Sequence, residues 1–289
     1  GVAYLTNNAT QLSTSRLAGT RPIVLNGGTA RLDGVVGRTV AGAPVDPAGI
    51  FAAQGGDARL VGRHVTLVNE VADVGDAVRI GYTGDCLAGS GSTTVELRDS
   101  VAVRYPWRLF RQGCADDTSG PCPAPAPRSA NAVFDRVHFD GARVAGGGGC
   151  FSDTNSTFGD ARLVSSADPR PRAGSPLIDT GTPGPLMAGE PDTDAMGRFR
   201  LVDGDANGSL VRDRGAYEYQ RLAPVLTASV SPASGVTGAI FGFRASASDA
   251  DGDRLSYGWS GNSTSMTTSK TSPPISTCQT RQWRSWKPV

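Results

Sequence analysis

The stretch "ARLVGRHVTLVN", residues 58–69, is the part of this 289-residue chain that points most directly to a fold. Valine, leucine and threonine dominate it, and such residues favour β-strands. Similar bursts, among them "RPIVLNG", "TTVELRDSVAVRY" and "NAVFDRVHFDG", are separated by Gly, Asn and Asp through the first 165 residues. No segment there keeps the 3.6-residue periodicity of a helix, so the sequence predicts an all-β region without long helices.

The bursts also recur at a regular spacing. "HVTLVN" (64–69), "SVAVRY" (100–105) and "RVHFDG" (136–141) share one pattern, which places Val65, Val101 and Val137 36 residues apart. A second echo links "GGTARL" (27–32), "GGDARL" (55–60) and "GDARL" (159–163). Fixed spacing is typical of solenoids, in which each coil stacks on the last. We therefore predict a right-handed parallel β-helix over residues 1–165; the alternative is a β-sandwich with irregular strands.

The cysteines follow the same spacing. Cys86 and Cys122 are 36 residues apart, and so are Cys114 and Cys150, while Cys278 lies far from the others. The first four are disulfide candidates, either between stacked coils or locally between Cys114 and Cys122, and their pairing stays open. Disulfides would fit an oxidising, extracellular location, whereas four buried free thiols are the alternative.

The bulk composition restricts the partners. The net charge is +1, so no overall field attracts nucleic acid, and no apolar run approaches the roughly 20 residues of a membrane span. The sequence begins within a structured-looking region, so we expect a fragment or a mature form in which a targeting signal cannot be seen. We expect a monomer that binds no nucleic acid and has no membrane span in this stretch.

Residues 159–219 carry three motifs in a characteristic order: "GSPLIDTG" (174–181), "DAMGRFR" (194–200) and "DRGAYEY" (213–219). This order resembles the end of bacterial secreted right-handed β-helix proteins, a segment often described as a choice-of-anchor region. The resemblance covers about sixty residues and implies an architecture rather than a reaction. It implies that residues 166–220 form a loop-rich cap over the open edge of the last coil, where unpaired backbone groups would otherwise invite aggregation.

In this cap we expect acidic and basic motif residues to bond to backbone groups and to one another. The residues with this expected structural role are Asp179, Asp194, Arg198 and Asp213.

The stretch "VDGDANGSLVRDRGAYEY" (202–219) also resembles a calcium loop. Asp203, Asp205, Asn207 and Gly208 match positions 1, 3, 5 and 6 of the D-x-[DN]-x-[DN]-G pattern, whose alternate side chains converge on one cation. Arginine stands where the closing glutamate belongs, and Asp213, one residue earlier, is the candidate to take its place. A structural Ca²⁺ at these residues is one expectation; the other is a polar turn whose side chains bond their own backbone.

Residues 223–265 form a separate region. "SASDADGDRLSYGWS" resembles the middle of PKD-type, immunoglobulin-like domains, which implies a partial β-sandwich with Trp259 in its core. Asp249, Asp251 and Asp253 form a second, weaker calcium candidate, for which a tight polar turn is the alternative. Residues 266–289 hold both lysines of the chain and break the family pattern, so we expect a disordered tail.

No catalytic residue can be assigned. Asp116-Asp117, His64 and His138 lack the surrounding motif of a known site, so we interpret them as loop and surface residues. The sequence favours a non-catalytic secreted or cell-surface protein acting in adhesion, glycan binding or as a spacer, with a polysaccharide or cell-surface glycan as the possible partner. The alternative is a polysaccharide lyase or glycoside hydrolase whose catalytic coils lie largely upstream.

Overall fold

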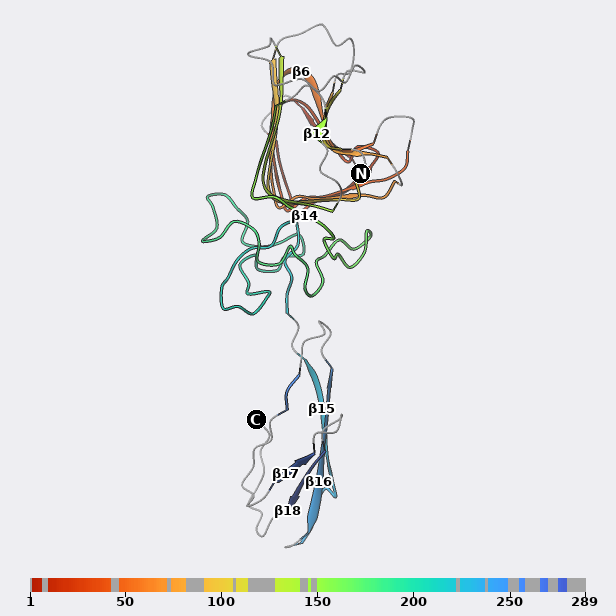
Figure 1. Ribbon diagram of the computed structural model, residues 1–289, viewed down its shortest axis with the longest axis vertical. Coiled ribbons are helices and arrows are strands. Elements are labelled where there is room, and N and C mark those ends of the chain that lie inside the picture. Colours follow the sequence, from red (N-terminus) through yellow and green to blue (C-terminus); the bar gives the residue numbers. More distant parts are fainter. Residues whose placement is uncertain are drawn as a thin grey trace. The chain divides into compact units, whose positions relative to one another are not determined.

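The computed structural model of the chain consists of two units, residues 1–220 and 221–289, which are described separately (Figure 1). The structure describes residues 2–6, 10–42, 47–71, 74–81, 91–105, 108–113, 128–140, 145–146, 150–221, 224–236, 239–248, 255–257, 266–269 and 275–279.

All regular elements in these ranges are β-strands. The first unit contains β1 (Ala3–Thr6), β2 (Thr10–Ser13), β3 (Arg16–Gly19), β4 (Ile23–Asp33), β5 (Val36–Thr39), β6 (Ala48–Arg63), β7 (Thr66–Asn69), β8 (Asp76–Gly81), β9 (Gly91–Val103), β10 (Arg108–Gly113), β11 (Arg128–Phe139), β12 (Ala145–Gly146), β13 (Cys150–Thr154) and β14 (Thr157–Phe158). The second contains β15 (Val225–Ser231), β16 (Ile240–Ser248), β17 (Met266–Ser269) and β18 (Ile275–Gln279). No described residue belongs to a helix that could cross a lipid bilayer.

The strands of the first unit form one 14-stranded sheet, and every pairing between its described strands is parallel. Register stacks like residues on one another: Ala30 pairs with Leu60, Leu60 with Val95, and Val95 with Ala132. All four are buried in the main core of the unit. Such columns are compatible with the predicted solenoid. The parallel pairing argues against the alternative, an antiparallel sandwich.

The expected 36-residue repeat is an average rather than a constant. Thr66 pairs with Val101, and Val101 pairs with His138, so the two steps are 35 and 37 residues. Because a shift of one residue turns a strand side chain to the other face, Val101 does not share a column with Val65 and Val137. Val65 and Val137 lie in the main core, whereas Val101 packs in a separate cluster.

The residues at one recurring corner of the sheet show how many residues separate equivalent positions in successive coils. Six residues there adopt left-handed backbone conformations with φ between 44° and 62°, and they follow one another at intervals of 20, 30, 35, 37 and 19 residues. They are Thr14, Gly34, His64, Asp99, Arg136 and Asn155. Non-glycine residues pay a steric cost in this conformation, so the surrounding contacts must hold them there. Unequal turn lengths explain why no single period fits the chain.

Residues 160–220, here called the loop segment, contain three isolated β-bridges and no named strand. We expected this segment to cover the edge of the last coil. The segment packs along the side of the sheet: Tyr217 packs on Val36 of β5, and the Ala216 amide donates to Thr66 Oγ1 of β7 at 2.8 Å. Arg214 reaches β14 by donating from Nη1 to Thr157 Oγ1 at 2.8 Å. The segment therefore contacts β5 and β7 as well as β14, a strand of the last coil.

The second unit is a four-stranded antiparallel sheet in the order β15–β16–β18–β17. Phe241 and Phe243 on β16 are buried, and β15 is exposed throughout. Strands β17 and β18 lie in the tail that we expected to be disordered, which corrects that expectation for residues 266–269 and 275–279. β-Branched residues, such as those in "ISTCQ" of β18, favour strand pairing despite the departure from the family pattern.

Candidate functional site

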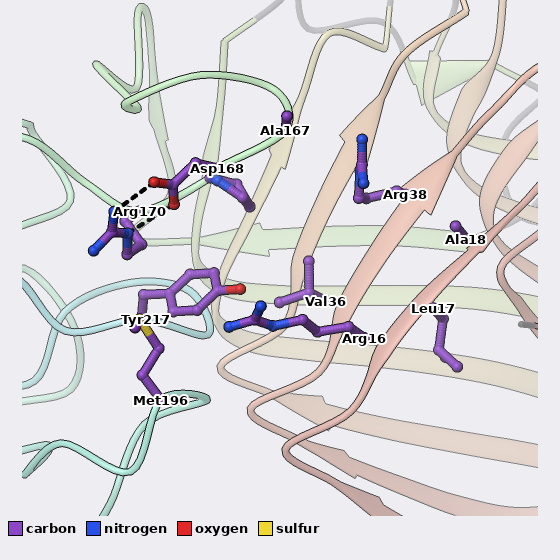
Figure 2. Close-up of a pocket in the computed structure, with 11 residues that line it drawn as sticks. Arg16, Leu17, Ala18, Val36, Arg38, Ala167, Asp168, Arg170, Met196 and Tyr217 are labelled. Carbon is purple, nitrogen blue, oxygen red and sulfur yellow. Dashed lines mark hydrogen bonds and ion pairs between the residues drawn. The ribbon is translucent and has the colours of Figure 1, made fainter.

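A pocket of about 460 Å³ lies between the sheet and the loop segment (Figure 2). One wall comes from β3 and β5, and the other from three stretches of the loop segment. The lining residues are Arg16, Leu17, Ala18, Val36, Arg38, Ala167, Asp168, Pro169, Arg170, Met196 and Tyr217. A concave site with an apolar base and a few convergent polar groups is the usual form of a small-ligand site.

Two arginines of the pocket are engaged by carboxylates. Arg170 donates from Nε to Asp168 Oδ1 at 2.7 Å and from Nη2 to Oδ2 at 2.5 Å. Arg38 donates from Nε to Glu70 Oε1 at 2.8 Å, and its Nη2 contacts the same oxygen. The hydrogen bonds from Arg170 lower the pKa of Asp168, and the same pair raises the pKa of Arg170. Asp168 is therefore an anion at neutral pH, and Arg170 stays a cation.

Arg16 lies differently. Its Cζ atom stands 5.7 Å from the centre of the Tyr217 ring, a cation–π distance, and Figure 2 shows its guanidinium between Val36 and that ring. The Tyr217 side chain is buried against Val36, Ala216 and Ala195, and this burial raises the pKa of its hydroxyl. The ring is thus a fixed wall, whereas the Arg16 side chain is exposed.

The loop wall of the pocket is held on the sheet by buried charges that we call the Glu190 network: His64, Glu190 and Arg212. Glu190 Oε1 lies 2.8 Å from His64 Nε2 and 2.8 Å from Arg212 Nε, and all three side chains are buried. Glu190 Oε2 accepts from the Met187 amide at 2.7 Å. Arg212 also donates to backbone carbonyls of the loop segment, for example to Pro185 O at 2.8 Å. A paired buried charge is tolerable because its partners replace the lost water.

The charges in this network set its protonation. Burial and the nearby Arg200 charge lower the pKa of His64 to about 3, against the opposing hydrogen bond to Glu190. Burial opposes ionisation of Glu190, but the hydrogen bonds from His64 and the Met187 amide, with the Arg212 charge, lower its pKa to about 2. At neutral pH a neutral His64 therefore donates to an anionic Glu190.

The loop segment also contacts Asp99, one of the corner residues with a left-handed backbone conformation. Asp99 Oδ1 accepts from the Thr182 amide at 2.7 Å, and its backbone carbonyl accepts from the Gly215 amide at 2.8 Å. Gly215 has φ of 103°, and a Cβ there would lie 2.7 Å from Thr66 Oγ1. The close approach of the two backbones thus requires glycine at the start of "GAYEY".

The motif acids have the structural role expected of them. Asp194 Oδ1 accepts from the amides of Met196 and Arg198 at 2.7 and 2.9 Å, and its Oδ2 accepts from the Glu218 amide at 3.0 Å. Asp213 Oδ1 accepts from the Asp179 amide at 2.8 Å. Arg198 takes part through its backbone.

The predicted calcium loop folds as a tight polar turn. Asp203 accepts from the Asn207 and Gly208 amides at 2.9 and 3.0 Å, and Asn207 Oδ1 accepts from the Ser209 amide at 2.8 Å. The carboxylates of Asp203 and Asp205 nevertheless come within 4.8 Å of that of Asp179, so these three could hold a metal ion. We call these three carboxylates the acidic turn.

The two other expected metal ligands, Asn207 and Asp213, do not join this cluster of carboxylates. Asn207 bonds within its own turn, and Asp213 is buried, with Oδ2 accepting from the Tyr219 amide at 2.6 Å. Sequence spacing missed Asp179, which lies more than twenty residues before the loop; its place in "GSPLIDTG" was the available signal.

Burial and the acids at positions 203 and 205 raise the pKa of Asp179 to about 6. Burial and the Asp179 charge raise the pKa of Asp213 to about 7, with Arg200 acting in the opposite direction. Both carboxyls therefore take up protons close to neutral pH.

Two groups of predicted metal-ligand and disulfide residues lie wholly or partly outside the described residues. The first is the weaker calcium candidate, Asp249, Asp251 and Asp253. The second comprises Cys86, Cys114 and Cys122, and for Cys150 only the backbone is described, in β13.

The two histidines are buried rather than on the surface. His64 belongs to the Glu190 network, while His138 bonds Thr157 Oγ1 through Nδ1 at 2.8 Å and Gly159 O through Nε2 at 2.9 Å. They stand in different columns, since His138 pairs with Val101.

Sequence reasoning missed the pocket, whose walls come from distant parts of the chain. Comparison with protein-family models, curated proteins and solved structures finds no match to this chain.

Proposed function

We propose that this chain is a non-catalytic secreted or cell-surface protein that binds carbohydrate in the pocket between β3, β5 and the loop segment. The observation that carries the proposal is the pocket itself: guanidinium groups that can donate hydrogen bonds to a polar ligand line it together with the apolar residues Leu17, Val36 and Met196. Sugars combine an apolar C–H face with hydroxyl groups, and such a pocket offers partners to both.

The proposal includes the finer architecture. The parallel columns and the recurring corner support a right-handed parallel β-helix for residues 1–158. The motif order supports a choice-of-anchor-type loop segment, and the antiparallel sheet supports an immunoglobulin-like second unit. Stacked coils give a rigid support for binding residues, which favours an adhesion or glycan-display role outside the cell.

The chemistry of the pocket favours binding over catalysis. A general acid needs a carboxyl with a raised pKa, whereas that of Asp168 is lowered by Arg170. An arginine acting as the base of a lyase would need a lowered pKa, and that of Arg170 is raised. These directions suit charged groups that hold a ligand and do not exchange protons with it.

The test is retention of the purified chain on immobilised neutral and acidic polysaccharides, with binding quantified by calorimetry on soluble oligomers. We expect saturable binding to at least one glycan and no change in the ligand. Absence of binding to every glycan would contradict the proposal. A steady rise in ultraviolet absorbance with polygalacturonate, alginate or chondroitin would favour the alternative, a polysaccharide lyase.

A further inference from the structure

More cationic than anionic side chains line the pocket. Arg16, Arg38 and Arg170 contribute three cations to the lining, and Asp168 contributes one anion. Glu70 is not a lining residue, but it pairs with Arg38. The pocket therefore keeps an excess of positive charge, although the chain as a whole is close to neutral with a net charge of +1.

Among the three pocket arginines, and counting partners within the described residues, only Arg16 has its whole guanidinium free of a carboxylate. The guanidinium groups of Arg38 and Arg170 already face carboxylates, and their side chains are 34% and 37% exposed. Within the described ranges, the Arg16 guanidinium makes no hydrogen bond or ion pair, and it contacts the ring of Tyr217. Stacking on a buried ring restricts the guanidinium without using its N–H groups, which leaves its planar fork ready for a carboxylate.

The apolar part of the pocket lies beside this fork. Leu17 and Val36 come from the sheet, and Met196, a residue that is 44% exposed, comes from the loop segment. Figure 2 shows Arg16 between Leu17 and Val36 on one side and Tyr217 and Met196 on the other. A ring with one apolar face and a carboxylate on its rim could contact both sets of residues.

We propose that the pocket selects a sugar carrying a carboxylate, that is, a uronate residue of an acidic polysaccharide, with Arg16 as the residue that pairs with the carboxylate. The inference rests on the proposed function and adds to it the class of ligand and the specificity-determining residue. Arg38 and Arg170 add attraction from a distance, and Asp168 limits it.

The experiment compares oligogalacturonate with its carboxyl-reduced form by calorimetry on the full chain at two salt concentrations. We expect the acidic oligomer to bind about tenfold more tightly, the ratio that one charge-assisted hydrogen-bonded pair supplies. Added salt should reduce this preference, because screening weakens exposed ion pairs.

Four variants assign the preference to Arg16. Arg16→Ala should lose about tenfold in affinity for the acidic oligomer and nothing for the reduced one, and Arg16→Lys should fall between, since it keeps the charge without the fork. Asp168→Asn should increase affinity for the acidic oligomer a few-fold, because it removes the anion of the pocket and releases Arg170. Arg31→Ala, at an exposed arginine of β4, is the matched control and should change neither affinity. Thermal melting of each variant checks that it folds.

The outcomes separate this inference from the function on which it rests. Equal binding of the acidic and reduced oligomers would overturn the inference and leave carbohydrate binding intact. Equal binding of a sulfated oligomer and the uronate would overturn the assignment to carboxylates. An unchanged preference in a folded Arg16→Ala variant would remove Arg16 from the role. Failure of every glycan to bind would overturn both proposals.

Discussion

Glu190 and the three carboxylates of the acidic turn belong to the same loop segment, yet their surroundings are opposite. Glu190 accepts hydrogen bonds from His64 and the Met187 amide and faces the Arg212 charge, and its pKa falls to about 2. Asp179 faces the carboxylates at positions 203 and 205, and its pKa rises to about 6. Burial raises the pKa in both places, so the difference comes from the neighbouring groups. Within one segment, charge pairing and charge crowding give carboxyls opposite dependences on pH.

The largest expected effect on stability comes from removing the buried cation that pairs with Glu190. Arg212→Met leaves Glu190 as a buried carboxylate without its cation and removes the donors to three backbone carbonyls, those of Thr182, Gly184 and Pro185. Loss of one partner of a buried pair costs about 3–5 kcal/mol of unfolding free energy. Denaturant unfolding of the wild type and the variant measures the loss.

The matched control for this prediction is Arg172→Met, at an exposed arginine of the same segment. A change of less than about 0.5 kcal/mol is expected there, as for most surface substitutions. Equal losses in the two variants would show that Arg212 does not act through a buried pair.

A second, smaller effect is a stability maximum below neutral pH, at about pH 4–5, where two opposing sets of pKa shifts balance. The folded pKa values of His64 and Glu190 lie below their unfolded values of 6.5 and 4.5, so the folded state binds fewer protons and loses stability as pH falls from about 6.5 towards 2. Asp179 and Asp213 behave in the opposite way: their pKa values rise from 3.8 to about 6 and 7, so their contribution is lost as pH rises through that range. The other described acids whose pKa values burial raises act in the same direction; they are Asp33, Asp99, Asp140 and Glu218.

Unfolding free energy measured from pH 3 to pH 9 tests both sides at once. We expect a loss of about 2 kcal/mol on each side of the maximum, the scale of one linked carboxyl. A steady increase in stability up to pH 9 would contradict the raised pKa values of Asp179 and Asp213. Constant stability down to pH 3 would contradict the lowered pKa values of His64 and Glu190.

Much of the strand content could be predicted from sequence, because inward valine, leucine and alanine recur in bursts wherever the sheet repeats. The register could not. Val101 has the local pattern of Val65 and Val137, yet unequal turn lengths of 35 and 37 residues move it to another face. The number of residues in each coil depends on the loops between its strands, and short-range residue patterns carry little information about those loops.

The site shows the same division. Local motifs identified Asp194 and Asp213 as structural acids, because their partners lie within a few residues in the motif or in the next motif. The pocket brings Arg16 together with Tyr217, some two hundred residues later, and the docking of the loop segment on the side of the sheet creates that contact. Only the tertiary packing of the segment reveals it.

The smallest expected effect tests whether a cation relieves the crowding in the acidic turn. An ion between the three carboxylates would replace mutual repulsion by attraction, so Ca²⁺ should raise the unfolding free energy and chelator should lower it. A loop without the closing glutamate suits weak binding, and Ca²⁺ at ten times its Kd would stabilise the folded state by about 1.4 kcal/mol. Asp205→Asn removes one ligand and one charge: it should abolish the response to Ca²⁺ and, in chelator at pH 8, stabilise the chain by about 0.5 kcal/mol. Asp192→Asn, at an exposed acid of the same segment, is the control and should keep the wild-type response. Equal melting of the wild type in Ca²⁺ and in chelator would show that Asp203 and Asp205 serve only the polar turn, and the crowded carboxyls would then be relieved by protons alone.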